Sequence, residues 1–165
     1  MTKKQLIATT ALAGVYFLNS AGAFAQDPAS QAGFDEDIKL LRKDLRSAKK
    51  QIIAANMDLT EAEAQQFWPI YDRYMIEISK ASDPKYSLLK DYAQNYSSMT
   101  GEQADNYING RAAVEDSVLR VRLKYIPIFR KVLSGKSTAL FFQLDWRLGL
   151  ILDLQLASQT PLVEP

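Results

Sequence analysis

Two groups of carboxylates are the side chains in this sequence that could do acid-base chemistry. Glu115 and Asp116 are adjacent, and Asp145 and Asp153 share one predicted helix. Paired carboxylates can act as a general acid and base when a cleft holds them at a defined separation. The sequence predicts no such cleft, so we interpret each group as surface charge or as part of a local ion pair.

The composition narrows the chemistry further, because the chain contains no histidine and no cysteine. These two residue types are the usual ligands of zinc, nickel and copper, and histidine is the commonest general base near neutral pH. The sequence also has no glycine-rich phosphate-binding loop. We therefore expect no catalytic residues, no metal site, no cofactor and no enzymatic activity.

The elements that position these residues are organised around a segment from Leu59 to Leu133, which predicts two helices folded back on each other. Thr60 is followed three residues later by Glu63, and Thr100 is followed in the same way by Gln103. A hydroxyl residue with Glu or Gln at this spacing is typical of a capping box at a helix start. The polar run before Thr100 predicts a turn near Ser98.

Prolines occur at matching depth in the two predicted arms. Pro69 and Pro127 both lie 29 residues from Ser98. A proline inside a helix removes a hydrogen bond and bends the helix, so we expect a bend at one level in both arms. At Asp83 and Pro84 the sequence is consistent with either a kink or a short break.

Two further helices flank this hairpin. The first has a stripe of apolar residues between positions 38 and 52, and the last begins after Ser134 and is apolar on nearly every side. We expect the last helix to be covered by other helices or by a second subunit. The fold class is thus all-α, with four helices built on a long, proline-bent antiparallel helical hairpin, as one domain over 34–159 and a tail over 160–165.

The N-terminal residues have the pattern of a secretory signal peptide. Lys3 and Lys4 precede an apolar run, and residues 23–25 are Ala-Phe-Ala. Cleavage after Ala25 would leave a flexible leader over 26–33 and a periplasmic protein. Without Lys3 and Lys4, 18 of the 20 basic residues remain against 19 acidic ones, so no general attraction to nucleic acid is expected.

The first helix has a basic face beside its apolar stripe. Such a face binds an anionic membrane, an acidic partner or an unfolded acidic client in some proteins, and is only a solvated surface in others. Both interpretations stay open at this point. The candidate binding residues are Lys39, Arg42, Lys43, Arg46, Lys49 and Lys50.

Two helix starts have a leucine followed by a hydroxyl residue. The first is Leu59 and Thr60, with Glu63 in place of the glutamine of the motif, and the second is Leu133 and Ser134. With the signal peptide, the lack of cysteine and the four helices, this pattern resembles the LTXXQ-motif family of periplasmic proteins, the Spy/CpxP-like group. The resemblance implies an ATP-independent chaperone or a stress-signalling modulator with a cradle-shaped, often dimeric, helical fold.

The function we expect is therefore that of a periplasmic chaperone-like protein that holds unfolded or stressed client proteins on a helical surface. The alternative is a periplasmic sensor or modulator that binds a membrane signalling partner. The expected partners are unfolded or envelope proteins, and a homodimer and a peripheral membrane contact both remain open.

Overall fold

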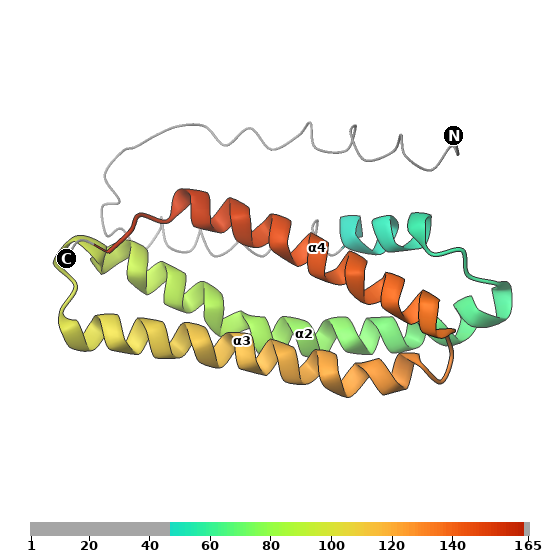
Figure 1. Cartoon of the computed structure of the whole chain (residues 1–165). Helices are drawn as coiled ribbons and strands as arrows, with labels where there is room; N and C mark the ends of the chain where they lie inside the picture. Colours follow the sequence, from blue (N-terminus) through green and yellow to red (C-terminus); the bar gives the residue numbers. More distant parts are fainter. Residues whose placement is uncertain (1–46, 164–165) are drawn as a thin grey trace. The chain divides into compact units, whose positions relative to one another are not determined.

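The computed structural model describes residues 47–163, all of which belong to one compact unit, Asp44–Pro165. Within this range the chain forms a helical segment over 47–56, then α2 (Glu61–Asn95), the short 3-10 helix η2 (Tyr96–Ser98), α3 (Gly101–Phe129) and α4 (Gly135–Gln159) (Figure 1). The described part has four α-helices and no strand, which confirms the all-α fold class. The predicted signal peptide and leader lie outside the described residues.

The helix starts are fixed by side chains close in sequence. At α2 the Thr60 hydroxyl accepts a hydrogen bond from the Glu63 amide at 3.2 Å, and the Thr60 amide donates to the Glu63 carboxylate at 2.9 Å. Thr100 and Gln103 form the same reciprocal pair at α3, with distances of 3.2 and 2.8 Å. Both predicted capping boxes are therefore confirmed, and η2 lies at the expected turn.

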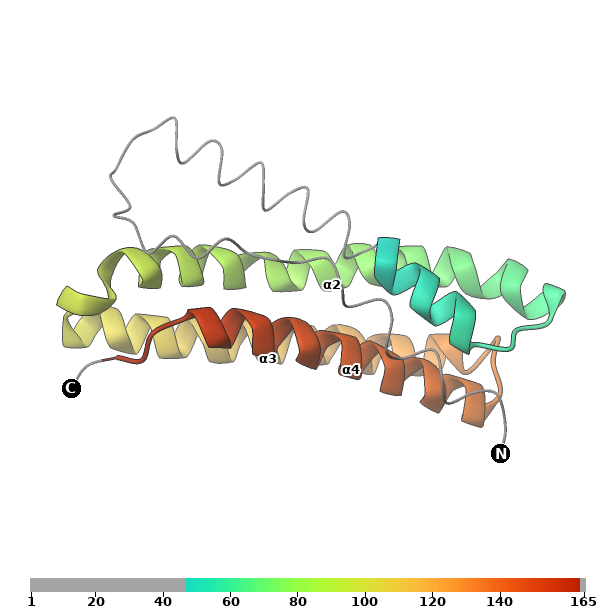
Figure 2. The same cartoon turned by 90° about the horizontal axis from the view of Figure 1, so that it is seen from above.

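Helices α2 and α3 lie side by side and run in opposite directions (Figures 1 and 2). Contacts at three levels define this pairing: the rings of Phe67 and Phe129 are 5.4 Å apart, those of Tyr74 and Tyr125 are 5.2 Å apart, and those of Tyr92 and Tyr107 are 4.6 Å apart. Because residue numbers rise along α2 as they fall along α3, the two helices are antiparallel.

The three prolines of the hairpin all lie inside continuous helix. Pro69 and Pro127 each lie two residues from the Phe67–Phe129 ring contact, both on the side toward η2, so they lie at a similar level, and the bends predicted there stay a prediction. The question left open at Asp83 and Pro84 has a clear outcome: α2 is not broken there. Figure 1 shows α2 changing direction between its green first part and its yellow-green last part, as expected for a helix that contains an internal proline.

The core is aromatic and gathers at the end of the hairpin away from η2, which we call the base. Phe129 contacts Phe67 and Phe141 with ring centroids 5.4 and 4.4 Å apart. Aromatic rings bury large apolar areas and gain further from edge-on packing, so this cluster should supply most of the hydrophobic stabilisation. Its buried members are Ile53, Met57, Phe67, Ile70, Tyr71, Tyr74, Ile78, Tyr125, Phe129, Leu133, Phe141 and Phe142.

Helix α4 runs along the hairpin from the base toward the tip formed by η2 (Figures 1 and 2). Phe141 and Phe142, in its first half, enter the core cluster. At the far end Lys85 pairs with Asp153, and the Tyr92 hydroxyl donates a hydrogen bond to the Pro161 carbonyl at 2.7 Å. None of the described helices is long and apolar enough to cross a membrane.

The apolar residues of α3 follow the predicted inward stripe only in part. The apolar spacing of α3 predicts an inward stripe that includes Val114, Leu119, Leu123 and Phe129. Val114 and Phe129 are buried as expected, whereas 49% and 57% of the surfaces of Leu119 and Leu123 are exposed, and the unpredicted Tyr125 is buried instead. The stripe facing α2 and α4 passes through Val114, Tyr125 and Phe129. The reason is that α3 has apolar residues on two faces, so spacing alone cannot identify the packed one.

Candidate functional site

A buried carboxylate joins four helical segments in the middle of the bundle. Asp145 on α4 has no exposed surface, although the sequence suggested a surface or local charge. Its Oδ1 accepts a hydrogen bond from Lys49 Nζ at 2.5 Å, and its Oδ2 accepts from the Tyr74 hydroxyl at 2.9 Å and from Arg122 Nε at 3.1 Å. Asp145 therefore joins the segment 47–56, α2 and α3 to α4.

The two cations explain why this carboxylate can be buried. An isolated charge is costly to remove from water, whereas a paired and fully hydrogen-bonded charge is tolerated. Lys49 and Arg122 keep 16% and 21% of their side-chain surfaces exposed, so each remains partly hydrated while it contacts Asp145. Burial, and then the charge of Asp145, raises the pKa of the Tyr74 hydroxyl, which therefore remains a donor at physiological pH.

Because donors occupy both of its oxygens, Asp145 has a structural role: its ion pairs and its hydrogen bond connect the helices. This corrects our interpretation of Asp145 as surface charge or as part of a local ion pair, because its ionic partners, Lys49 and Arg122, are distant in the sequence. The physical reason is that α4 is apolar on nearly every side, so its sequence does not show which face is packed. Asp153, its proposed neighbour, is instead half-exposed and pairs with Lys85.

The other pair of carboxylates, Glu115 and Asp116, forms local ion pairs, which is one of the two interpretations made from the sequence. Glu115 lies 3.4 Å from Arg111, and Asp116 lies 2.7 Å from Arg120, in both cases one helical turn away along α3. Such exposed pairs contribute little to stability. Among the described residues no group of three or more acidic side chains could hold a metal ion.

Only two of the predicted basic binding residues fall in the described range. Lys49 is engaged with Asp145, so it belongs to the interior and does not form part of a free basic face. Lys50 pairs with Asp72 at 2.7 Å, and its ammonium lies 5.2 Å from the centre of the Trp68 ring. The remaining four residues, Lys39, Arg42, Lys43 and Arg46, lie outside the described residues.

The positions that carry the family resemblance serve as helix starts. Leu133 is buried and Leu59 packs against the core, while Ser134 accepts a hydrogen bond from the Ser137 amide at 3.1 Å and caps α4. The backbone hydrogen bond from Thr60 lowers the pKa of Glu63, which keeps the capping carboxylate ionised. In this structure these residues stabilise the fold, and Thr60, Glu63 and Ser134 are confirmed as caps.

The hairpin also has an open groove of about 600 Å³ between α2 and α3. Its lining is mostly small and apolar, with Asp83 and Asp91 as its acidic residues. The groove lies where Gly110 allows the two helices to approach closely, since a Cβ at that position would lie 2.8 Å from Leu88 Cδ2. This groove is open to solvent.

The most unusual surface of the described part is the side of α4 that faces away from the hairpin. Five large apolar side chains are exposed there, and we call them the outer face of α4. Leu150 and Leu154 are 67% and 72% exposed. The five are Leu140, Trp146, Leu150, Ile151 and Leu154.

We had expected α4 to be covered by other helices or by a second subunit. The structure covers only one side, through Thr138, Phe141, Phe142 and Asp145. The apolar composition of α4 was the sequence signal for this surface, but only the packing shows which residues remain outside.

Comparisons with known protein families, with characterised proteins and with solved structures found no match to this chain. The function proposed below is therefore supported by the chain's own sequence and contacts.

Proposed function

We propose that this protein is a periplasmic, ATP-independent chaperone-like binding protein that holds unfolded or stressed client proteins on a helical surface. The observation that carries the proposal is the outer face of α4, where large apolar side chains remain exposed beside one another. Contiguous apolar surface on a soluble domain usually marks a site of interaction. The Ala-Phe-Ala pattern of residues 23–25 after the apolar run supports export to the periplasm.

The outer face of α4 can bind an unfolded chain through hydrophobic contact alone. Unfolded proteins expose apolar segments, and contact with Trp146, Leu150 and Leu154 would remove these segments from water. The gain is proportional to the apolar area buried and is not directional, so such a face accepts clients of different sequence.

The buried Asp145 contacts help to present this surface. The outer face can remain exposed only if α4 does not rotate to bury it against the hairpin. Asp145 fixes the rotation of α4, because a turn about the helix axis would pull the carboxylate away from Tyr74 and Arg122. A rigid support of this kind reduces the entropy lost on binding.

The test is an aggregation assay with two dissimilar unfolding proteins and no nucleotide. The chain from Gln26 should suppress the aggregation of both. Changing Leu150 and Leu154 together to Gln should weaken this suppression, because Gln preserves helix propensity but removes apolar area. The matched control changes Leu119 and Leu123 of α3, which are also exposed, to Gln. This variant should still suppress the aggregation of both clients.

Suppression of neither client, with the fold intact by circular dichroism, would contradict the proposal. In a separate binding titration, tight binding to a single folded envelope domain without suppression of either client would favour the sensor or modulator instead.

A further inference from the structure

The charges of α4 are distributed unevenly between its acids and its bases. The helix contains four charged residues, Lys136, Asp145, Arg147 and Asp153. Both acids are neutralised, Asp145 by Lys49 and Arg122 and Asp153 by Lys85. Lys136 and Arg147 are exposed, and neither forms an ion pair with any residue between 47 and 163. The charge that α4 presents to solvent is therefore positive.

The unpaired Arg147 lies within the apolar surface. Trp146, Leu150 and Leu154 follow one another at four-residue spacing and form a line along the helix, and Arg147 and Ile151 form a parallel line beside it. This places a cation one residue from an exposed Trp and one turn from two exposed aliphatic side chains, Leu150 and Ile151. The line from Trp146 to Leu154 is about 12 Å long.

We infer that the outer face of α4 binds the surface of a membrane that contains anionic lipids, with α4 parallel to the bilayer. A helix that lies in the membrane interface buries Leu and Trp side chains at the level of the headgroups and places Lys or Arg near anionic lipid. Trp is favoured at this depth because its ring is apolar and its N–H is polar. This inference goes beyond the proposed client binding and does not depend on it.

A lipid surface fits the unpaired Arg147 better than a folded protein partner does. A protein would have to place a carboxylate at one point inside an apolar contact, or leave the guanidinium buried without a partner. Anionic headgroups cover the whole bilayer surface, and the long Arg side chain can reach them while its methylene groups stay in the apolar layer. Exposed apolar residues beyond the end of α4, Leu162 and Val163, extend the same kind of surface.

The experiment uses Trp146 as a local reporter. Trp68 and Trp146 are the two tryptophans of the chain, so Trp68→Phe leaves a single one while keeping a ring against Phe67 and Tyr71. The chain from Gln26 is titrated with vesicles of phosphatidylcholine alone or mixed with phosphatidylglycerol. With the mixed vesicles we expect a blue shift of the Trp146 emission and quenching by brominated lipid. Cosedimentation of the chain with Trp68 intact provides a second measurement.

Three variants separate the contributions. Arg147→Gln and Lys136→Gln should each weaken binding to mixed vesicles roughly fivefold. Added salt should weaken the remaining binding of each variant less than it weakens binding of the parent. Leu150→Gln with Leu154→Gln should weaken it by about tenfold or more. Leu119→Gln with Leu123→Gln, on α3, is the matched control and should bind as the parent does.

Several results would overturn the inference. Cosedimentation without a Trp146 shift would mean that another part of the chain, such as the basic residues 39–46, binds the vesicles. Equal binding to both vesicle types would remove the role of Arg147 and Lys136. A shifted Trp146 emission in buffer, together with a dimeric mass, would show that a second copy covers the face. Suppression of client aggregation without any vesicle binding would leave the proposed function standing and refute the membrane contact.

Discussion

The carboxylate of Asp145 on α4 and the hydroxyl of Tyr74 on α2 lie 2.9 Å apart, and neither residue has any exposed surface. The two residues are 71 positions apart in the chain, so only the folded bundle brings them together. The same carboxylate contacts Lys49 and Arg122, so it joins four helical segments of the bundle.

Replacing Asp145 with Asn should be severely destabilising. The change removes the negative charge and leaves the mostly buried cations of Lys49 and Arg122 without their acidic partner. Breaking a buried ion pair by removing one partner typically costs about 3–5 kcal/mol. The free energy of unfolding from urea titration measures this cost.

Asp153→Asn is the matched control on the same helix. Its side chain is 52% exposed, so losing the contact with Lys85 should cost about 1 kcal/mol or less. Similar losses in the two variants would mean that burial of Asp145 does not determine its contribution.

Removing the hydroxyl of Tyr74 should have a different effect from removing that of Tyr71. Tyr74→Phe deletes a donor to Asp145 and should cost about 1.5–3 kcal/mol, since the acceptor is charged. The Tyr71 hydroxyl is also buried but makes no hydrogen bond within the described residues. Tyr71→Phe should therefore be neutral or slightly stabilising, because it removes an unsatisfied polar group. Equal destabilisation by both variants in a denaturant titration would contradict this assignment of partners.

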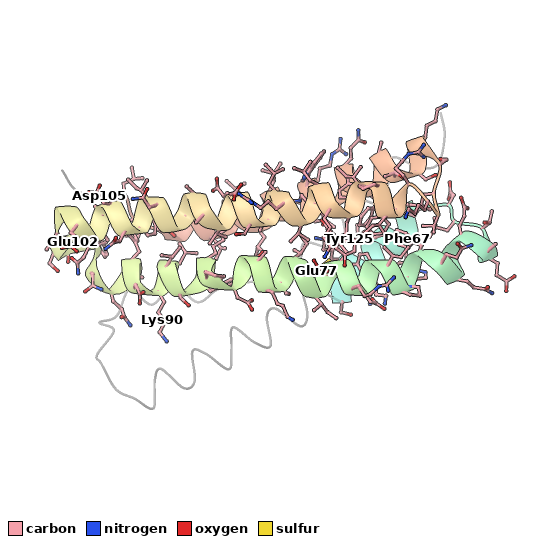
Figure 3. The ribbon with its side chains drawn as sticks, turned by 90° about the horizontal axis from the view of Figure 1, so that it is seen from below. Phe67, Glu77, Lys90, Glu102, Asp105 and Tyr125 are labelled. Atoms are coloured by element: carbon pink, nitrogen blue, oxygen red, sulfur yellow. The ribbon has the colours of Figure 1, made fainter. Side chains whose placement is uncertain are left out.

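Glu77 should make part of the stability dependent on pH in the acid range. Figure 3 shows Glu77 on α2 and Tyr125 on α3 pointing toward one another, and hydrogen bonds from Lys124 at 2.7 Å and from the Tyr125 hydroxyl at 2.8 Å reach its carboxylate. The bond from Lys124, followed by that from Tyr125, lowers the pKa of Glu77 below its ordinary value of 4.5.

A lowered pKa means that the unfolded chain takes up a proton first as the pH falls. The contribution of Glu77 is therefore fully present above about pH 4.5 and is lost as the pH falls through the lowered pKa. We expect Glu77→Gln to be less stable than the parent at neutral pH and the difference to shrink below pH 4.5. Urea titrations across this range measure it. In a Lys124→Gln background the acid-dependent part should be smaller, and an unchanged pH profile there would refute the role of Lys124.

The two glycines inside helices α3 and α4 should respond differently to alanine. At Gly149 a Cβ would meet only Arg122 at 3.7 Å, so the better helix propensity of Ala should stabilise the protein by up to about 1 kcal/mol. At Gly110 the Cβ would lie 2.8 and 3.0 Å from the two methyl groups of Leu88, which must move.

We therefore expect Gly110→Ala to yield no gain by itself. In a Leu88→Ala background the same change should stabilise the protein as it does at Gly149. Thermal unfolding of the four proteins in this double-mutant cycle measures the coupling. Additive effects would mean that α2 and α3 do not approach closely at Gly110.

The sequence was most informative where structure depends on near neighbours. Thr60 and Thr100 each meet a partner three residues away, so their capping boxes followed from spacing. The antiparallel pairing of the two arms was predicted, but the individual side-chain contacts between elements distant along the chain were not. Lys49 has the same type and spacing as its basic neighbours, and only the packing of α4 brings Asp145 to it.

The second feature that could not be predicted was which side of a helix faces the core when the helix has apolar residues on two sides. In α3, Leu123 and Tyr125 are two residues apart and both fit an apolar stripe, but the position of α2 selects Tyr125. In α4 the same ambiguity concealed both the buried Asp145 and the exposed Trp146. The outer face of α4 therefore could not have been predicted residue by residue without the fold.

The uneven placement of the aromatic core has a consequence for motion. The large buried rings gather at the base, whereas Val114 and Tyr92 are the buried side chains of the hairpin outside this cluster among the described residues. Local opening is easiest where little apolar area is buried. Backbone amides of α2 and α3 near η2 should then exchange with deuterium well before those around Phe67 and Phe129, so the hairpin opens from its tip while its base stays closed.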